Sequence, residues 1–319
     1  HDDYLQAGLR LARDVAGFDL ERRRNPKQLN PILFGLGRPG CGKTVTAHAV
    51  GNYFLDYCLE RGVPARFVVV RRTDWASSYQ NASASNLVRI FRDEVHGFDG
   101  VCGVYWPDID TAFASRDSSS LRVEEKQNLA AVFGVFDGTL LPRDGKWFLM
   151  CDANTLHMDE ATISRICQTP HRVRGPDTSA DYVTLARDIL LADVRDKLPG
   201  EDGAWSRIGD VAAELDLSGR NVESVCNAVR AIVQDFEYPR EYFEASFEER
   251  ERIVESLGRD VSEDRIVALL RERADFEEEA AAHAEEQAFE GEVAAIVRHL
   301  NASREAAERA SRPSSGGKP

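Results

Sequence analysis

The chain has 319 residues, which is enough for two domains and an appendage. Acidic residues outnumber basic ones by 54 to 40, and the net charge of −14 argues against non-specific binding to nucleic acid, because phosphate contacts need a basic face. A run of about 18 apolar residues and a signal peptide are both absent, so we expect no membrane insertion.

The choice of basic residues and cysteines indicates the cellular setting. Only six of the 40 basic residues are lysines, and the rest are arginines. Many acids with few lysines are typical of a halophilic archaeon, where salt screens charge repulsion, but a GC-rich genome would also favour arginine. The six cysteines are scattered and form no C-x-x-C pair, so we expect free thiols and a cytoplasmic protein.

The first half of the chain alternates predicted helices and strands. A helix over 3–19 opens it without a methionine, so we expect further sequence upstream. Apolar runs and helical spacing predict strands at 32–37, 65–72, 101–108 and 146–154, and helices at 43–61, 82–95 and 123–138. This alternation predicts parallel pairing with right-handed crossovers, and therefore a three-layer αβα domain around a central parallel sheet.

Beyond about Asp177 the strand signals stop. Amphipathic helices at 181–198, 205–215 and 219–236 predict a small all-α domain, and more acidic helices follow. A hairpin, a coiled segment and a solvated spacer are all compatible with the acidic part, and we favour the spacer because its apolar positions do not sustain a long heptad. The predicted division is an N-terminal linker helix (1–30), an αβα domain (31–176), a helical domain (177–239), an acidic helical extension (240–309) and a disordered tail (310–319).

The most specific motif is GRPGCGKT, at 37–44, which matches G-x-x-x-x-G-K-[ST] between a predicted strand and a predicted helix. Its glycines let backbone N–H groups surround a phosphate at the positive end of the helix. Lys43 is expected to bridge the β- and γ-phosphates of ATP, and Thr44 to place its hydroxyl on Mg²⁺. The expected nucleotide-binding residues are Gly37, Arg38, Pro39, Gly40, Cys41, Gly42, Lys43, Thr44 and Val45.

A second segment, GVYWPDIDTAFASR at 103–116, is an apolar strand that runs into acids. P-loop enzymes use such acids to hold magnesium and to activate water, and Asp108 is the candidate for both tasks. Asp110 lies two residues further along a chain that we take as extended, so it should share the face of Asp108 at a greater distance from the phosphates.

With these motifs in order, the chain resembles the AAA-family ATPases of the AAA+ superfamily over roughly residues 30 to 235. The segment SSYQNASASNLVRIF is similar to the family's pore loop and the helix after it, and VYWPDIDTAFASR is similar to its acid-bearing strand. NLAAVFGVFDG resembles the helix before the fourth strand, and FLMCDANTLHMDEATISR resembles the stretch with a polar sensor and a trans-acting arginine. LSGRNVESVCNAV is similar to the lid helix with a second sensor.

The resemblance implies roles for individual residues. Tyr79 would grip substrate in the pore, although Asn81 replaces the usual glycine, and Asn154 would orient the attacking water. Arg165, with Arg172 as the second candidate, would reach a neighbour's γ-phosphate as an arginine finger.

Arg220 would contact phosphate within its own chain. Each of these residues also has an ordinary structural alternative: a turn-capping asparagine, a surface ion pair, an exposed arginine or a loop aromatic packed on its own domain.

The aligned acids are one carboxylate short. Pro107 stands where the family has its magnesium-organising Asp, and Asp108 stands where it has the water-activating Glu. With the alignment shifted by one residue, Asp108 becomes the magnesium acid and Ile109 replaces the base. General-base help is worth about 10²–10⁴-fold in rate, so we expect a bound nucleotide with slow hydrolysis.

The leading hypothesis is an ATPase that couples hydrolysis to remodelling of a protein substrate in a homo-oligomeric ring, a hexamer being one size open to it. The main alternative is an ATP-binding switch or scaffold with little or no hydrolysis. A small-molecule P-loop kinase would need a second basic acceptor site that is not evident. A nucleic-acid loading machine stays open because TISRICQ is similar to clamp-loader finger motifs.

Overall fold

A computed structural model describes residues 2–77, 82–111, 133–139, 141–156, 158, 160–168 and 170–311. Its contacts divide the chain into two compact units. The sheet unit comprises His1–Asp181 with Ser218–Asn221, and the helical unit comprises Tyr182–Leu217 with Val222–Pro319.

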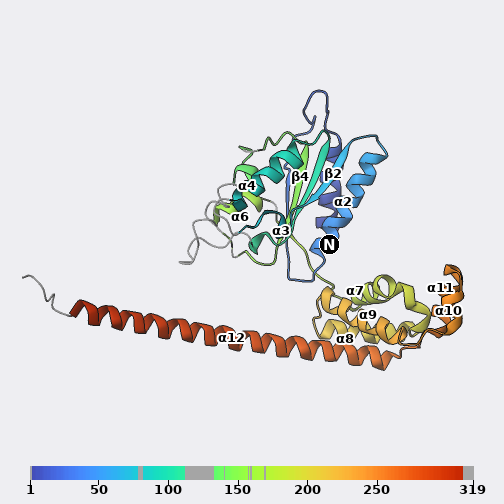
Figure 1. Cartoon of the computed structure of the whole chain (residues 1–319). Coiled ribbons are helices and arrows are strands. Elements are labelled where there is room, and N and C mark those ends of the chain that lie inside the picture. The colour runs from blue at the N-terminus through green and yellow to red at the C-terminus, as the bar shows by residue number, and fades with distance from the viewer. Residues whose placement is uncertain are drawn as a thin grey trace, which may run out of the picture. The chain divides into compact units, whose positions relative to one another are not determined.

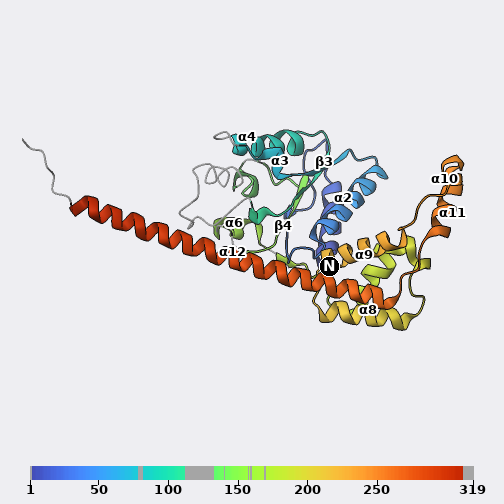
Figure 2. The ribbon, with the colours of Figure 1, turned by 60° about the horizontal axis from the view of Figure 1, so that its bottom comes forward.

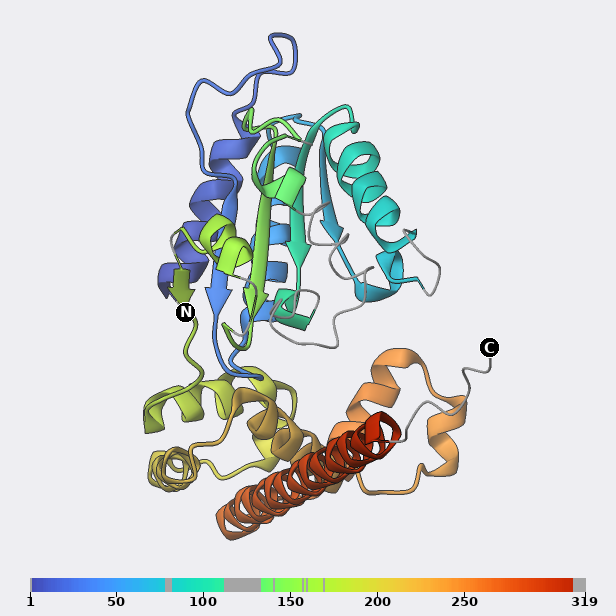
Figure 3. The same ribbon diagram turned by 90° about the vertical axis from the view of Figure 1, so that its left-hand side faces the viewer.

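The sheet unit is built on five parallel strands in the order β2-β3-β4-β1-β5 (Figures 1 and 3). The strands are β1 Ile32–Leu36, β2 Ala65–Val69, β3 Val101–Trp106, β4 Trp147–Ala153 and β5 Pro170–Arg172. The predicted αβα fold with a central parallel sheet is confirmed. The four predicted strands are each slightly shorter than expected, and β5 was missed because three residues beginning with proline carry no apolar pattern.

Helices pack on both faces of this sheet. They are α1 Asp2–Ala16, α2 Lys43–Leu59, α3 Arg72–Trp75, α4 Ala82–Arg89, the π-helical turn Ile90–His96, the 3-10 turn Ile109–Thr111 and α6 Glu160–Ile166. One core lies between the sheet and α1 and α2, and includes Tyr4 and Phe54. The other includes Leu87 and Ile166 from α4 and α6. Because α1 is part of the first core, we propose to count it with the αβα domain and not as a separate linker.

The central strands β3 and β4 are buried along their whole length. Parallel strands covered on both faces read as continuous apolar runs, which is why both were visible in the sequence. Gly103 on β3 leaves room for two aromatic rings, because a Cβ there would lie 2.6 Å from Phe148 and 2.7 Å from Phe67.

The helical unit follows from α7 onward. Its elements are α7 Ser179–Val183, the π-helical turn Thr184–Leu190, the 3-10 segment Ala192–Lys197, α8 Asp202–Glu214, α9 Gly219–Val233, α10 Arg240–Glu244, α11 Phe247–Leu257 and α12 Glu263–Ser311. The single helix predicted at 181–198 is therefore three short pieces. Trp205 and Val229 lie in the core, together with Ile266 from the start of α12.

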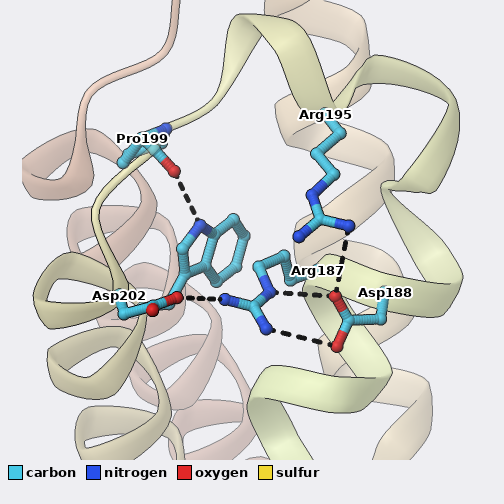
Figure 4. A network of polar contacts seen from close by, with 6 residues as sticks. Arg187, Asp188, Arg195, Pro199 and Asp202 are labelled. Carbon is cyan, nitrogen blue, oxygen red and sulfur yellow. Dashed lines mark hydrogen bonds and ion pairs between the residues drawn. The ribbon is translucent and has the colours of Figure 1, made fainter.

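Polar contacts tie the short pieces of this unit to α8. Figure 4 shows Arg187 between two carboxylates, with Nε 2.9 Å from Asp188 Oδ1 and Nη1 2.9 Å from Asp202 Oδ1. The indole N–H of Trp205 donates to the carbonyl of Pro199 at 2.8 Å. Exposed ion pairs add little stability, so the apolar core around the buried Trp205 ring holds this unit together.

The acidic extension consists of the short helices α10 and α11 and one long continuous helix, α12. α12 runs for 49 residues (Figure 2), and its first turns, including Leu270, are buried in the core of the helical unit. Side chains from 275 to 303 are almost all exposed. Glu263–Ser311 therefore does not fold back into a hairpin, and we propose that the helical domain extends to about Leu270 before the spacer begins. None of the helices in the described residues combines the length and apolar character of a membrane span.

We predict that Gly103→Ala lowers the free energy of unfolding of the sheet unit by about 1–3 kcal/mol, because the added methyl overpacks the rings of Phe67 and Phe148. Urea titration followed by tryptophan fluorescence would measure this. The matched control is Gly203→Ala, at a position with open space around it, which should leave stability unchanged or raise it. Equal effects of the two substitutions would contradict the packing argument.

Candidate active site

The turn between β1 and α2 has the geometry of a phosphate-binding loop. Gly40 and Gly42 adopt left-handed conformations, with φ of 76° and 89°, which only glycine adopts without strain. At Gly37 a Cβ would lie 2.3 Å from the carbonyl oxygen of Val173. The glycines of the motif are therefore required by the backbone, and the predicted strand–turn–helix context is confirmed.

Lys43 at the start of α2 points back into this turn. Its ammonium donates to the carbonyls of Gly37 at 2.7 Å and Arg38 at 3.1 Å, and to the side-chain oxygen of Asn154 at 2.8 Å. Lys43 is 6% exposed, whereas Thr44 on the next position is exposed. The cation is thus held where a bound triphosphate would need it.

Asn154 links the turn to the acid-bearing strand. It follows β4, and its side-chain N–H donates to Asp108 Oδ1 at 3.0 Å. Since β4 lies between β1 and β3, the three carboxyl ends meet at one edge of the sheet. The structure therefore joins Lys43, Asn154 and Asp108 in one chain of hydrogen bonds.

Asp110 does not share the face of Asp108. The extended chain assumed beyond β3 is wrong, because Asp108 has a φ of 48° and residues 109–111 form a 3-10 turn. Asp110 Oδ2 accepts the backbone N–H groups of Asn154 and Thr155, both at 3.0 Å. Asp110 therefore fixes the backbone that carries Asn154.

Two further residues belong to this site and were missed in the sequence. The Tyr105 hydroxyl lies 2.6 Å from Asp152 Oδ2 and 3.0 Å from the Thr44 hydroxyl. Asp152 on β4 is 1% exposed, and its Oδ1 accepts the backbone N–H of Asp108 at 3.2 Å. The available signal was an acid inside the apolar run KWFLMCDAN, since buried strands rarely carry charge.

Burial governs the protonation of this pair. It raises the pKa of the Asp152 carboxyl above its ordinary value, while the hydrogen bonds from Tyr105 and Asp108 and the charge of Lys43 act in the opposite direction. Burial also raises the pKa of the Tyr105 hydroxyl, and the neighbouring Asp152 adds to the shift. The tyrosine is thus a neutral hydrogen-bond donor.

The structure places the remaining predicted arginines on α6, β5 and α9. Arg165 on α6 donates through Nε to Asp137 at 2.8 Å and stacks on Phe133, and Arg172 is exposed at the end of β5. Arg220 is exposed in the first turn of α9, in the segment that groups with the sheet unit, and a Cβ on Gly40 would lie 2.9 Å from its Cβ.

The predicted pore residue Tyr79 and its neighbour Asn81 lie outside the described residues.

Residues 33–170 match the family model described as "ATPase family associated with various cellular activities (AAA)". The chain carries an AAA-family P-loop ATPase domain. Its fold is similar to the crystal structure of the FIGL-1 AAA domain in complex with ADP, with a TM-score of 0.53 and 15% identity over 82% of this chain and 79% of that one.

It is also similar to C. elegans PCH-2, with a TM-score of 0.51 and 13% identity over 86% of this chain and 68% of that one. At these identities the two structures support the AAA fold alone. No curated protein matches the chain in sequence.

We predict different effects for the two acids after β3. Asp110→Ala should lower the free energy of unfolding by about 1–2 kcal/mol, because two backbone N–H groups lose their acceptor. Asp108→Asn should change it by less than about 0.5 kcal/mol, since asparagine tolerates the left-handed backbone. Urea titrations of both variants would test this, and an equal loss would refute the division of roles.

Proposed function

We propose that the AAA domain binds Mg·ATP and hydrolyses it. The observation that carries this proposal is the chain of hydrogen bonds from Lys43 through Asn154 to Asp108 at the edge of the sheet. It brings a cation for phosphate, a polar group for water and a carboxylate for its proton to one place. The AAA-family match over 33–170 supports the same assignment.

The residues present fit a triphosphate. A Cβ at Gly37 would collide with the Val173 carbonyl and one at Gly40 with Arg220, so the loop that we expect to cradle the phosphates needs glycine at both positions. The α2 N-terminus has no side-chain cap competing for its N–H groups. Lys43 would exchange its carbonyl contacts for phosphate oxygens, and Arg220 would add a second cation. Thr44 is exposed in the first turn of α2, directly after Lys43.

The residues also fit Mg²⁺. A cluster of three or more acidic, histidine or cysteine side chains able to hold a metal is absent from the described part of the chain. Magnesium needs no such cage, since it keeps several waters and binds through one or two protein oxygens together with substrate phosphates. Thr44 and Asp108 offer such oxygens, and the ion would supply charge stabilisation for the leaving and transferred phosphates.

Hydrolysis in this site would be slow. Asp108 is exposed and would accept the proton of the attacking water, which the Asn154 amide orients. Pro107 supplies no second acid, and an aspartate reaches less far than a glutamate.

The same features support an alternative, an ATP-binding switch or scaffold with little or no turnover. Its specific support is the engagement of Asp108 Oδ1 by Asn154, which leaves the shorter acid with one free oxygen for water.

A remodelling role is the broader proposal. AAA proteins commonly act on other macromolecules as homo-oligomeric rings, and Arg165 would then complete a neighbour's site after leaving Asp137. We propose a protein substrate, gripped through Tyr79, because the net charge of −14 disfavours nucleic acid. All six cysteines are free thiols, which supports a reducing, cytoplasmic setting.

We predict an ATPase rate that depends on Lys43 and on Asp108. Lys43→Ala should abolish phosphate release, and Asp108→Asn should lower kcat by about 10²–10⁴-fold while ATP binding persists. Phosphate release and fluorescent-ATP binding, measured over a range of protein concentrations and at low and high salt, test this. A parental rate in Asp108→Asn would remove the base assignment, and binding without any Lys43-dependent release would establish the switch.

We predict that Arg165 acts across subunits. Arg165→Ala alone should lose about 10³-fold in rate, and mixing it with Lys43→Ala should restore part of the activity, because the Lys43-intact sites then receive Arg165 from a neighbour. Mixing Lys43→Ala with Asp108→Asn is the control, since neither variant can complement a site of the other. Recovery with Arg172→Ala in place of Arg165→Ala would move the finger to Arg172.

A further inference from the structure

A carboxylate lies beside the position where the site lacks one. β3 and β4 are paired in parallel with Trp106 opposite Cys151, so the next residues, Pro107 and Asp152, are neighbours across the two strands. The Asp108 N–H donates to Asp152 Oδ1 at 3.2 Å, which confirms this adjacency. The acid missing from β3 thus has a counterpart one strand away.

Asp152 has no direct route to the nucleotide. It is 1% exposed, and both of its oxygens are occupied, Oδ1 by the Asp108 N–H and Oδ2 by the Tyr105 hydroxyl. A buried carboxylate is costly unless its hydrogen bonds are satisfied, as they are here. Any role in the site must therefore pass through one of these two neighbours.

Tyr105 provides that connection. Its hydroxyl has one proton and two oxygens within reach, Asp152 Oδ2 at 2.6 Å and Thr44 Oγ1 at 3.0 Å. An ionised carboxylate can only accept, so the tyrosine proton goes to the closer Asp152. The Thr44 hydroxyl then donates its own proton to the Tyr105 oxygen. The lone pairs of the Thr44 oxygen are then free to face solvent, as a magnesium ligand requires.

We propose that Asp152, acting through Tyr105, orients the Thr44 hydroxyl toward Mg²⁺. Asp152 on β4 would thereby replace the carboxylate that is lacking at position 107, directly after β3. This inference rests on the proposed Mg·ATP site and adds two residues to it. Both are positioning residues, because neither touches the nucleotide. If Asp152 and Tyr105 only hold β3 against β4, their substitution should affect ATP binding equally with and without magnesium. If they orient Thr44 toward Mg²⁺, substitution should weaken ATP binding only when magnesium is present.

The test compares ATP affinity with and without magnesium. The full chain is titrated with a fluorescent ATP analogue in Mg²⁺ and in EDTA. The Kd in EDTA divided by the Kd in Mg²⁺ measures how much magnesium strengthens ATP binding. Tyr105→Phe, which keeps the ring and removes the hydroxyl, should reduce this ratio about tenfold and leave the Kd in EDTA unchanged. Tyr53→Phe on α2 is the matched control and should keep the parental ratio.

Asp152→Asn provides an independent variant. It should reduce the ratio as Tyr105→Phe does, and the double variant should resemble either single one, because the two residues act in series. Urea titration of each variant confirms that it is folded.

Folded variants with the parental ratio would overturn the proposed relay, by which we mean the hydrogen bonds from Asp152 through Tyr105 to Thr44. That result would not affect the proposed ATP site. Equal losses in Mg²⁺ and EDTA would overturn the relay in favour of a structural role. A parental chain that binds no ATP in either condition would instead refute the proposed function, and the relay with it.

Discussion

The hydrogen bond between the Lys43 ammonium and the Asn154 amide, 2.8 Å long, joins the turn after β1 to the end of β4. This hydrogen bond depends on the strand order of the sheet as well as on the two side chains. Parallel strands bring their carboxyl ends to one edge, and the order β2-β3-β4-β1-β5 makes the phosphate turn a neighbour of the polar strand end. The same edge receives Asp108, whose position depends on its bond to Asn154.

The acids of this site are divided between two environments. Asp108 is exposed and has an oxygen left to receive a proton, whereas Asp152 is buried with both oxygens engaged. We propose that Asp108 acts in the chemistry and that Asp152 only orients its neighbours. If Asp152 replaces the missing magnesium acid, slow turnover would come from the short side chain of Asp108 and not from poor metal binding. Pro107, directly after β3, would then change the position of the acid more than the ability of the site to bind Mg²⁺.

The long helix α12 belongs partly to the core of the helical unit and is partly exposed. The core of this unit extends from Tyr182 into the first turns of α12, so the acidic extension begins inside a folded unit. Beyond that point, the side chains of α12 are almost all exposed as far as residue 303. This part of the helix nevertheless carries exposed apolar side chains at helical spacing, Phe289, Val293, Ile296 and Leu300 among them, so its exposure is not explained by a lack of apolar residues.

Part of the fold and of the site could be predicted from the amino-acid sequence alone. Apolar runs alternating with helical spacing established the parallel αβα fold, and GRPGCGKT in that context established the phosphate loop, because glycine is the residue that left-handed turns require. The short strand β5 and the division of helix 181–198 were missed. Three residues hold too little pattern, and the breaks after α7 depend on tertiary packing.

The sequence by itself determined the class of fold and the phosphate loop, and it predicted a shortage of one acid after β3. Only the tertiary structure decided that the chain bends at Asp108, that Asp110 holds backbone, and that Asp152 stands next to Pro107. The physical reason is that strand register and a left-handed residue determine which side chains meet. Asp152 and Thr44 are more than a hundred residues apart in the chain, and the Tyr105 hydroxyl on a third element forms hydrogen bonds with both.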